Sequence, residues 1–308
     1  MKTESTLEKI LAAGHLAVTS ECGPPRGALP AKIKEKAEML RGFVDAVNVT
    51  DNQTAMVRMS SLAACIFLRQ MGLNPILQMV TRDRNRLAMQ SDILGAYSHD
   101  IDTMLCLSGD HPHFGDHAMA ANVHDVDSIQ FVDMVRTMRD EGKFQGGEPI
   151  DGPPKMFIGA AANPFADPFE LRVARLAKKV KAGVDFIQTQ CIYNVDKFAK
   201  WMEGVRDRGL HEKVYILAGI TPMKSAGMAR YMKNKVPGMD VPDELVKRIA
   251  GVPKEKQADE GIKICIETIE RCKEIEGVNG FHIMAIEWEQ KVPEIVEQAG
   301  LLPRPSVN

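Results

Sequence analysis

The stretch FELRVARLAKKVKAGVDFIQTQ (169–190) contains the structural unit that decides the fold. Residues 169–182 place apolar side chains at helical spacing, and residues 184–190 form a short apolar run of the kind found in strands. This run does not alternate strictly between apolar and polar residues, which favours a strand buried on both faces, as in a parallel sheet. The polar residues QTQ stand where the strand is expected to end.

The same alternation of strand and helix recurs along the chain. Seven more apolar runs predict strands over 15–20, 45–50, 74–80, 101–107, 155–161, 213–219 and 280–285. Helical patterns lie between and after them, over 29–40, 55–72, 85–97, 127–141, 194–208, 223–234 and 288–299. A further helical stretch, 242–276, is interrupted near 251–255. Strands and helices that alternate in this way, with right-handed crossovers, form a parallel sheet.

The number of these units favours a closed sheet. Eight strand–helix units in 308 residues predict an α/β fold, a (β/α)8 TIM barrel with an extra helical stretch before the eighth strand. An open doubly wound sheet is the alternative, but the G-x-G-x-x-G turn that usually follows its first strand is missing. Because no linker rich in Ser, Gly or Pro divides the chain, we expect residues 1–308 to form a single barrel domain.

The composition narrows the class of protein. The formal net charge of -2 indicates neither a nucleic-acid partner nor a membrane partner. No N-terminal signal pattern occurs, and no apolar run approaches the roughly 20 residues of a membrane span, so we expect a cytoplasmic protein. The 6 cysteines are scattered without a C-x-x-C pair, which argues against an iron–sulfur cluster or a structural zinc site in this chain.

Polar side chains stand at the expected strand ends, where barrels of this kind carry their chemistry. They are Glu21 after the first strand, Thr50 and Asp51 after the second, Gln78 in the third, Asp110 after the fourth, Asn163 after the fifth and Gln190 at the end of the sixth. Such a set suits a flat heteroaromatic ligand with many donors and acceptors, such as a flavin or a pterin. Loop capping explains any single position, but it explains Glu21 and Gln190 poorly because both directly follow apolar runs.

The segment HPHFGDH (111–117) contains four possible metal ligands, His111, His113, Asp116 and His117. They lie in one loop with Pro and Gly, and no helical i, i+4 spacing holds them together. We therefore expect no metal site, and expect this loop, His111 included, to pack against a bound cofactor or to hydrogen-bond with it.

Several motifs together resemble one family. They are TSECGPPRG (19–27), VTDN (49–52), QMVTRDRNRLAMQSDILGA (78–96), LSGDHP (107–112), KKVKAGVDFIQTQ (178–190), AGITPMKSAGMARYM (218–232) and VPGMDVPDEL (236–245). In this order they resemble methylenetetrahydrofolate reductase of the bacterial, flavin-dependent type that consists of the catalytic domain alone. The resemblance covers about residues 5 to 300. It implies a (β/α)8 barrel that holds a flavin at the strand ends and reduces 5,10-methylenetetrahydrofolate to 5-methyltetrahydrofolate.

The resemblance also implies roles for individual residues. Glu21 is the expected general acid, protonating the folate nitrogen before flavin N5 delivers a hydride, and an apolar strand end would raise its pKa for that task. Asp110 is the second expected catalytic residue and would contact both the pterin and the flavin. Gln190 and Met228 are expected to contact folate. The expected cofactor-binding residues are Thr50, Gln78, Ser108, Gly109, Asp110, His111, Asn163 and Lys179.

Departures from the family pattern affect the cofactor and the electron donor. Cys22 and Gly23 replace aromatic residues. Ser108 stands where relatives often have Arg, which removes a cation near the flavin diphosphate, so FMN becomes an alternative to the expected FAD. Met228 and Met232 occupy positions at which relatives contact folate or nicotinamide. The electron donor is therefore expected to be NAD(P)H or a separate electron-transfer subunit, and the chain is expected to form an oligomer or a hetero-complex.

Three other functions remain open at this point. A barrel methyltransferase that moves a methyl group from methyltetrahydrofolate to a corrinoid protein would share the pterin-binding acids but need no flavin. A non-catalytic barrel subunit would keep the fold without the chemistry, although the retention of both Glu21 and Asp110 argues against it. A metal-dependent hydrolase rests on the histidine loop alone.

Overall fold

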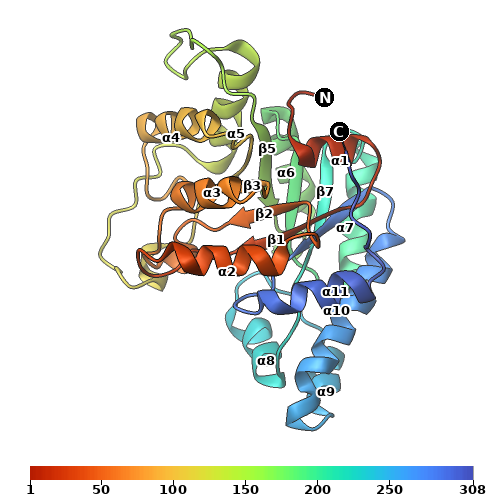
Figure 1. Cartoon of the computed structure of the whole chain (residues 1–308). Coiled ribbons are helices and arrows are strands. Elements are labelled where there is room, and N and C mark those ends of the chain that lie inside the picture. The colour runs from red at the N-terminus through yellow and green to blue at the C-terminus, as the bar shows by residue number, and fades with distance from the viewer. Residues whose placement is uncertain (308) are drawn as a thin grey trace.

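Eight parallel strands form a closed barrel in chain order, β1 to β8, in the computed structural model, which describes residues 1–307 (Figure 1). The strands are β1 (Ala17–Cys22), β2 (Ala46–Val49), β3 (Pro75–Val80), β4 (Thr103–Leu107), β5 (Phe157–Ala162), β6 (Phe186–Cys191), β7 (Tyr215–Ile220) and β8 (Val278–Ile283). Pairing of β1 with β8, in the register Thr19 opposite His282, closes the sheet. The predicted (β/α)8 barrel is confirmed.

Helices cover the outside of the barrel (Figure 1). They are α1 (Thr6–Ala12), α2 (Pro30–Leu40), α3 (Ser61–Gln70), α4 (Arg86–Ser98), α5 (Ser128–Arg136), α6 (Glu170–Ala182), α7 (Val195–Asp207), α8 (Ala226–Lys235), α9 (Asp243–Ala250), α10 (Gln257–Lys273) and α11 (Val292–Gln298). Short turns of helix are η1 (Gln53–Ala55), η2 (Pro112–Phe114), η3 (Thr137–Glu141), η4 (Lys254–Lys256) and η5 (Glu289–Lys291). Helices α9 and α10 confirm the extra helical stretch before the eighth strand.

Two predicted boundaries differ from the structure. The helix predicted over 55–72 begins only at Ser61, because the Ser60 hydroxyl caps it by accepting from the Ala63 N–H at 3.1 Å. Before that cap, Thr54 and Ala55 have positive φ angles, which a helix does not allow. The first strand runs two residues later than predicted, because its pairing with β2 continues to Cys22 opposite Val49.

Helix α1, which the sequence patterns did not predict, closes the amino-terminal end of the barrel. Its side chains Leu7, Ile10 and Leu11 pack onto the inward-facing apolar residues at the strand starts, Phe157 and Phe186 among them. This packing supplies an apolar floor beneath the barrel interior. Seven residues are too few for a strong periodic signal, which explains why the pattern was missed.

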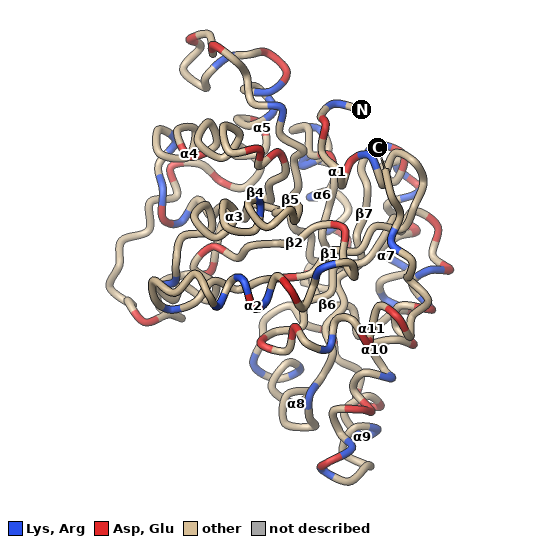
Figure 2. Tube along the Cα trace, viewed as in Figure 1, with Lys and Arg blue, Asp and Glu red and all other residues tan. Residues whose placement is uncertain are grey.

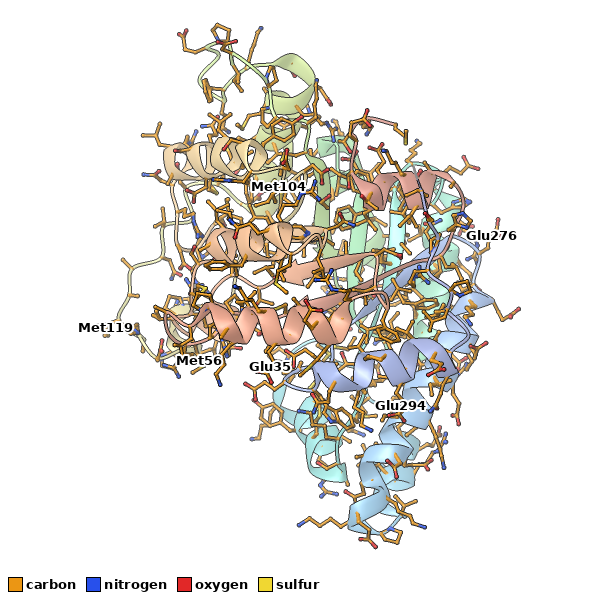
Figure 3. All side chains as sticks on the ribbon, viewed as in Figure 1. Glu35, Met56, Met104, Met119, Glu276 and Glu294 are labelled. Atoms are coloured by element: carbon orange, nitrogen blue, oxygen red, sulfur yellow. The ribbon has the colours of Figure 1, made fainter. Side chains whose placement is uncertain are left out.

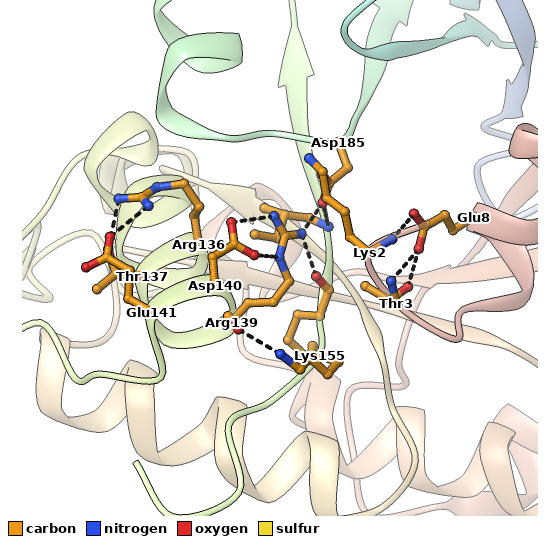
Figure 4. A network of polar contacts seen from close by, with 12 residues as sticks. Lys2, Thr3, Glu8, Arg136, Thr137, Arg139, Asp140, Glu141, Lys155 and Asp185 are labelled. Atoms are coloured by element: carbon orange, nitrogen blue, oxygen red, sulfur yellow. Dashed lines mark hydrogen bonds and ion pairs between the residues drawn. The ribbon is translucent and has the colours of Figure 1, made fainter. Parts of the chain in front are cut away.

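A polar network lies at the same end, around the buried carboxylate of Asp185 (Figure 4). Asp185 accepts from Lys2 Nζ at 2.6 Å, from Arg139 Nη1 at 2.5 Å and from the Ile158 N–H at 2.8 Å. The buried Arg139 also pairs with Asp140, its neighbour in the chain, and donates to the Met156 carbonyl. These contacts connect the amino-terminal segment and η3 to the starts of β5 and β6.

Charges are spread over the outer surface of the barrel. In Figure 2, basic and acidic residues are interspersed along the helices and loops. Across residues 1–307, no helix combines the length and the apolar character that crossing a membrane requires.

Candidate functional site

A cavity of about 280 Å3 lies at the carboxyl ends of the strands. It is lined by residues from five strands or the loops after them, β1, β2, β3, β4 and β6. Seven of the residues with a predicted catalytic or binding role line it: Glu21, Thr50, Gln78, Ser108, Gly109, Asp110 and Gln190. Residues from distant parts of the chain therefore meet here because the barrel brings all carboxyl ends to one rim.

A second cavity, of about 200 Å3, adjoins the first and shares Leu107, Ser108 and Gln190 with it. Asn163 and Lys179 line this second cavity, together with Arg175 of α6. The two remaining predicted residues, His111 and Met228, line neither cavity. We call the two cavities the strand-end cavity and the lysine cavity.

Glu21 is the next-to-last residue of β1, and its side chain is 17% exposed. Its Oε1 lies 3.6 Å from Nε2 of His282, a buried residue of the neighbouring strand β8. The other imidazole nitrogen, Nδ1, lies 2.9 Å from the Thr19 hydroxyl. The sequence analysis missed His282; the available signal was one histidine inside an apolar strand run.

The Glu21–His282 pair stands on a buried polar chain inside the barrel. The Gln188 amide donates to the Thr19 hydroxyl at 3.2 Å and exchanges two hydrogen bonds with the Asn48 amide, of 2.7 and 2.9 Å. When Thr19 accepts from Gln188, its own proton is available to Nδ1 of His282. The hydroxyl can also accept from Nδ1, so the Thr19–His282 hydrogen bond is compatible with either imidazole tautomer.

Thr50 and Asp51, which follow β2, differ in whether their side chains have hydrogen-bond partners. The hydroxyl of Thr50 is buried and has no hydrogen-bond partner within residues 1–307. Asp51 is fully engaged, since its Oδ2 accepts from the Val80 N–H at 3.0 Å and from Arg84 Nη1 at 2.6 Å. A buried hydroxyl without a partner is costly, and of the two residues only Thr50 has an unused hydrogen-bonding group among the described residues.

Asp110 stands exposed at the mouth of the strand-end cavity. The residue before it, Gly109, has φ +85°, and a Cβ there would approach Val80 Cβ to 3.0 Å. Glycine is therefore needed for the chain to turn this closely past β3. The Asp110 carbonyl accepts from Arg82 Nη1 at 2.9 Å, which ties the turn to the end of β3.

Lys179 is an almost fully buried cation, with 7% of the residue exposed. Its ammonium group donates to the Ala161 carbonyl, and no ion pair to it occurs among the described residues. Burial lowers the pKa of Lys179 to about 8, and the charge of Arg175 acts in the same direction. A buried ammonium without a carboxylate favours an anionic ligand, such as a phosphate group, in the lysine cavity.

Three other predicted residues contact other parts of the protein. The Asn163 amide accepts from the N–H groups of Phe165 and Ala166 and donates to the Gly238 carbonyl, so it holds its own loop. His111 is exposed and accepts from the His113 N–H through Nδ1. Met228 belongs to an apolar cluster beside the ends of β6 to β8.

The side chains of the loop 111–117 are not arranged around a common point where a metal ion could bind. Asp116 pairs with Arg26 Nη2 at 2.5 Å and with His117 Nδ1 at 3.0 Å. Among residues 1–307, no cluster of three or more His, Cys, Asp or Glu side chains could hold a metal ion. The loop therefore acts as a link between the β4 and β1 ends.

The chain is similar to proteins of known families. Residues 6–300 match the family model of methylenetetrahydrofolate reductase. Methylenetetrahydrofolate reductase 1 of Schizosaccharomyces pombe is 31% identical over 153 residues, which are 47% of this chain and 24% of that protein. Methylenetetrahydrofolate reductase 2 of the same organism is 28% identical over 227 residues, 68% of this chain and 33% of that protein. The chain thus spans a quarter to a third of the length of these curated relatives.

A solved structure supports the fold. The uncharacterized protein from Clostridium thermocellum that binds two copies of 5-methyl-5,6,7,8-tetrahydrofolic acid superposes with a TM-score of 0.64, at 14% identity, over 96% of this chain and 100% of that one. This likeness concerns the barrel alone. The family model covers nearly the whole chain, and on that basis the chain belongs to the methylenetetrahydrofolate reductase family.

Proposed function

We propose that this chain is a single catalytic barrel, residues 1–308, that reduces 5,10-methylenetetrahydrofolate to 5-methyltetrahydrofolate with a bound flavin. The observation that carries the proposal is that Glu21, Asp110 and Gln190, from three separate strand ends, line one cavity. Membership of the family supports the same reaction. The carboxylates lie at the rim where barrel enzymes bind their substrates.

The residues around the two cavities fit a flavin. Thr50 offers an unpartnered hydroxyl, Gly109 allows close approach of the backbone, and Lys179 offers a buried cation for a phosphate group. Gln78 and Ser108 add polar groups between them. When bound, the flavin supplies the hydride, and the protein contributes binding, orientation and electrostatics.

Glu21 is the proton donor in this proposal. Its carboxyl group holds the proton that passes to the folate nitrogen as the five-membered ring opens. His282 Nε2, at 3.6 Å, orients the carboxyl group from the side of β8. The Thr19 hydroxyl, which bonds Nδ1 of the same ring and accepts from the Gln188 amide, holds the imidazole in place beside Glu21.

The substrate is held by residues on the other side of the rim. Asp110 accepts hydrogen bonds from the amino end of the pterin, and Gln190 binds the ring from the end of β6. Both side chains lie at the strand-end cavity, which supports these roles. Met228, outside the cavity, contacts the part of folate that extends beyond it. Asn163 and His111 contribute through the loops that they hold in place.

We propose FAD as the cofactor, as the family resemblance implies, with FMN as the alternative. The buried amine of Lys179 suits a phosphate group, which both flavins carry. The electron donor is NAD(P)H or a separate electron-transfer subunit, and the chain works as an oligomer or in a hetero-complex.

A half-reaction experiment tests the proposal. The purified chain is loaded with FAD or FMN, reduced anaerobically with dithionite, and mixed with methylenetetrahydrofolate while flavin absorbance is followed. We expect reoxidation of the flavin and formation of 5-methyltetrahydrofolate. A chain that takes up neither flavin, or a reduced flavin that folate does not reoxidise, would overturn the proposal. A colourless chain that binds methyltetrahydrofolate would favour the methyltransferase.

A further inference from the structure

Arg82, which follows β3, forms hydrogen bonds with the chain after β2 and after β4 at the strand-end cavity. The sequence analysis did not identify this contact. Arg82 lines the cavity and has a side chain only 3% exposed. Its guanidinium donates to the Asn52 carbonyl after β2, at 3.3 Å, and to the Asp110 carbonyl after β4, at 2.9 Å. It also forms two bonds of 2.7 Å with the Asp83 carboxylate.

These contacts use most of the donors that a guanidinium has. Nε donates to Asp83, Nη2 donates to Asp83 and Asn52, and Nη1 donates to Asp110. Four of the five N–H groups are thus engaged in one planar fork. A lysine could keep the charge but could not reach three partners in different directions.

The backbone of Arg82 holds the same loop from its other side. Its carbonyl accepts from the Val123 N–H at 2.8 Å, while its N–H donates to the Ser108 carbonyl at 3.1 Å. The loop that follows β4 is therefore attached to Arg82 at Ser108 and Asp110 and again at Val123, before α5 begins. Between these two attachments the loop projects from the barrel, and Met119 at its tip is 96% exposed (Figure 3).

We propose that Arg82 is the positioning residue that holds the Asp110 carboxylate at the mouth of the strand-end cavity, opposite Glu21 and Gln190. This inference rests on the proposed function for its catalytic consequence. Arg82 acts through Asp110, because its guanidinium donates to the Asp110 carbonyl and so holds the backbone from which the carboxylate projects. Misplacing a binding group by about 1 Å can cost about 100-fold in rate.

The amino-terminal end of the barrel provides a matched control. Arg139 is also a buried arginine that pairs with the aspartate next in the chain, Asp140, and donates to a backbone carbonyl (Figure 4). It lines neither cavity of the candidate site. Variants of Arg139 therefore measure what the loss of a buried arginine does to stability alone.

The experiment compares Arg82→Lys and Arg82→Ala with Arg139→Lys and Arg139→Ala. Hydrogen–deuterium exchange of residues 108–123 is measured in the chain without flavin, together with the melting temperature. We expect faster exchange in this segment for both Arg82 variants and an unchanged rate for both Arg139 variants. Wild-type exchange in a folded Arg82→Ala chain would overturn the proposal, whether or not the chain reduces folate.

The flavin-loaded chains then test the catalytic consequence. Arg82→Lys is expected to raise the KM for methylenetetrahydrofolate and to slow flavin reoxidation about 10- to 100-fold. Guanidinium ion, at concentrations far below denaturing ones, is expected to restore part of the rate of Arg82→Ala, whereas methylammonium is not. A wild-type KM and rate in Arg82→Lys would contradict the catalytic part. An inactive wild-type chain would instead contradict the proposed function.

Discussion

Glu21 Oε1 and His282 Nε2 lie 3.6 Å apart across the seam where β1 meets β8. The pair exists only because the barrel closes, since the two residues stand near opposite ends of the chain. A carboxyl group beside an imidazole can exchange or share a proton, and here it faces the strand-end cavity. The Glu21 carboxyl group, with an imidazole beside it, therefore lies at the cavity where we propose that the substrate binds.

The first prediction concerns Glu21→Gln. The amide keeps the size of the side chain but cannot donate the required proton, so the folate half-reaction should slow by about 10²- to 10⁴-fold. Flavin binding and flavin reduction should be unchanged. Rapid-mixing absorbance measurements separate the two half-reactions. Glu35→Gln, on the exposed side of α2 (Figure 3), is the control and should react like the wild type. Normal folate reduction by Glu21→Gln would remove its assigned role.

The second prediction concerns the buried contact between His282 and Thr19. His282→Leu leaves the Thr19 hydroxyl without its 2.9 Å partner and should destabilise the chain by about 1–3 kcal/mol. Thr19→Val removes the hydroxyl as well, so the double variant should lose less than the sum, with a coupling of about 0.5–3 kcal/mol. Urea unfolding of all four chains measures this. Strict additivity would show that the contact contributes nothing.

The third prediction follows from the depressed pKa of Lys179, about 8 in the folded chain. An unfolded lysine titrates near 10.4, so between these values the unfolded chain binds more protons and folding stability should rise with pH. Below about pH 8 both states are protonated and the full burial penalty remains. Lys179→Met should therefore stabilise the flavin-free chain at neutral pH and abolish this rise.

The same substitution should weaken flavin binding, because the phosphate loses its buried cation. In the wild type, flavin affinity should fall as pH increases through about 8. Fluorescence titration at several pH values measures both effects. Lys178→Met, its exposed neighbour on α6, is the control and should change neither the affinity nor the pH dependence. Equal flavin affinity in Lys179→Met and the wild type would exclude the lysine cavity as the phosphate site.

The fourth prediction concerns Gly109→Ala. The positive φ of 85° and the 3.0 Å approach to Val80 should together displace the turn, at a cost of about 1–2 kcal/mol from the backbone alone. Because Asp110 follows directly, the KM for folate should rise as well. Gly27→Ala is the control, since its added methyl group meets open space and its φ is ordinary. Kinetics and thermal unfolding check both parts; a normal KM would disconnect the turn from substrate binding.

The fifth prediction separates stability from chemistry. Asp185→Asn removes the charge that Lys2 and Arg139 share at the amino-terminal end (Figure 4). Breaking a buried ion pair of this kind costs about 3–5 kcal/mol. The denaturant midpoint should therefore fall, while the rate per folded molecule stays at the wild-type value. A change in folate KM would show that the two ends of the barrel are coupled.

The local patterns of apolar residues predicted the barrel, but they did not predict which side chains contact each other at the site. The strand runs were recognised because buried parallel strands are short apolar segments between turns. The run before Gln190 is one example, and Glu21 and Gln190 were identified because a polar side chain directly follows each apolar run. The predicted start of α3 is too early, since Met56 and Met59 match a helical period although the backbone at Met56 is extended and the helix is capped at Ser60.

What the sequence by itself determined is the order of strands and helices and the polar character of the strand ends, because both are properties of neighbouring residues. Only the tertiary structure decided which side chains meet: His282 beside Glu21, Arg82 between Asn52 and Asp110, and Lys179 at its own cavity. It also separated Met228 from the cavity and committed Asn163 to its own loop. The physical reason is that contacts across a closed barrel depend on register and closure, which no local pattern of residues encodes.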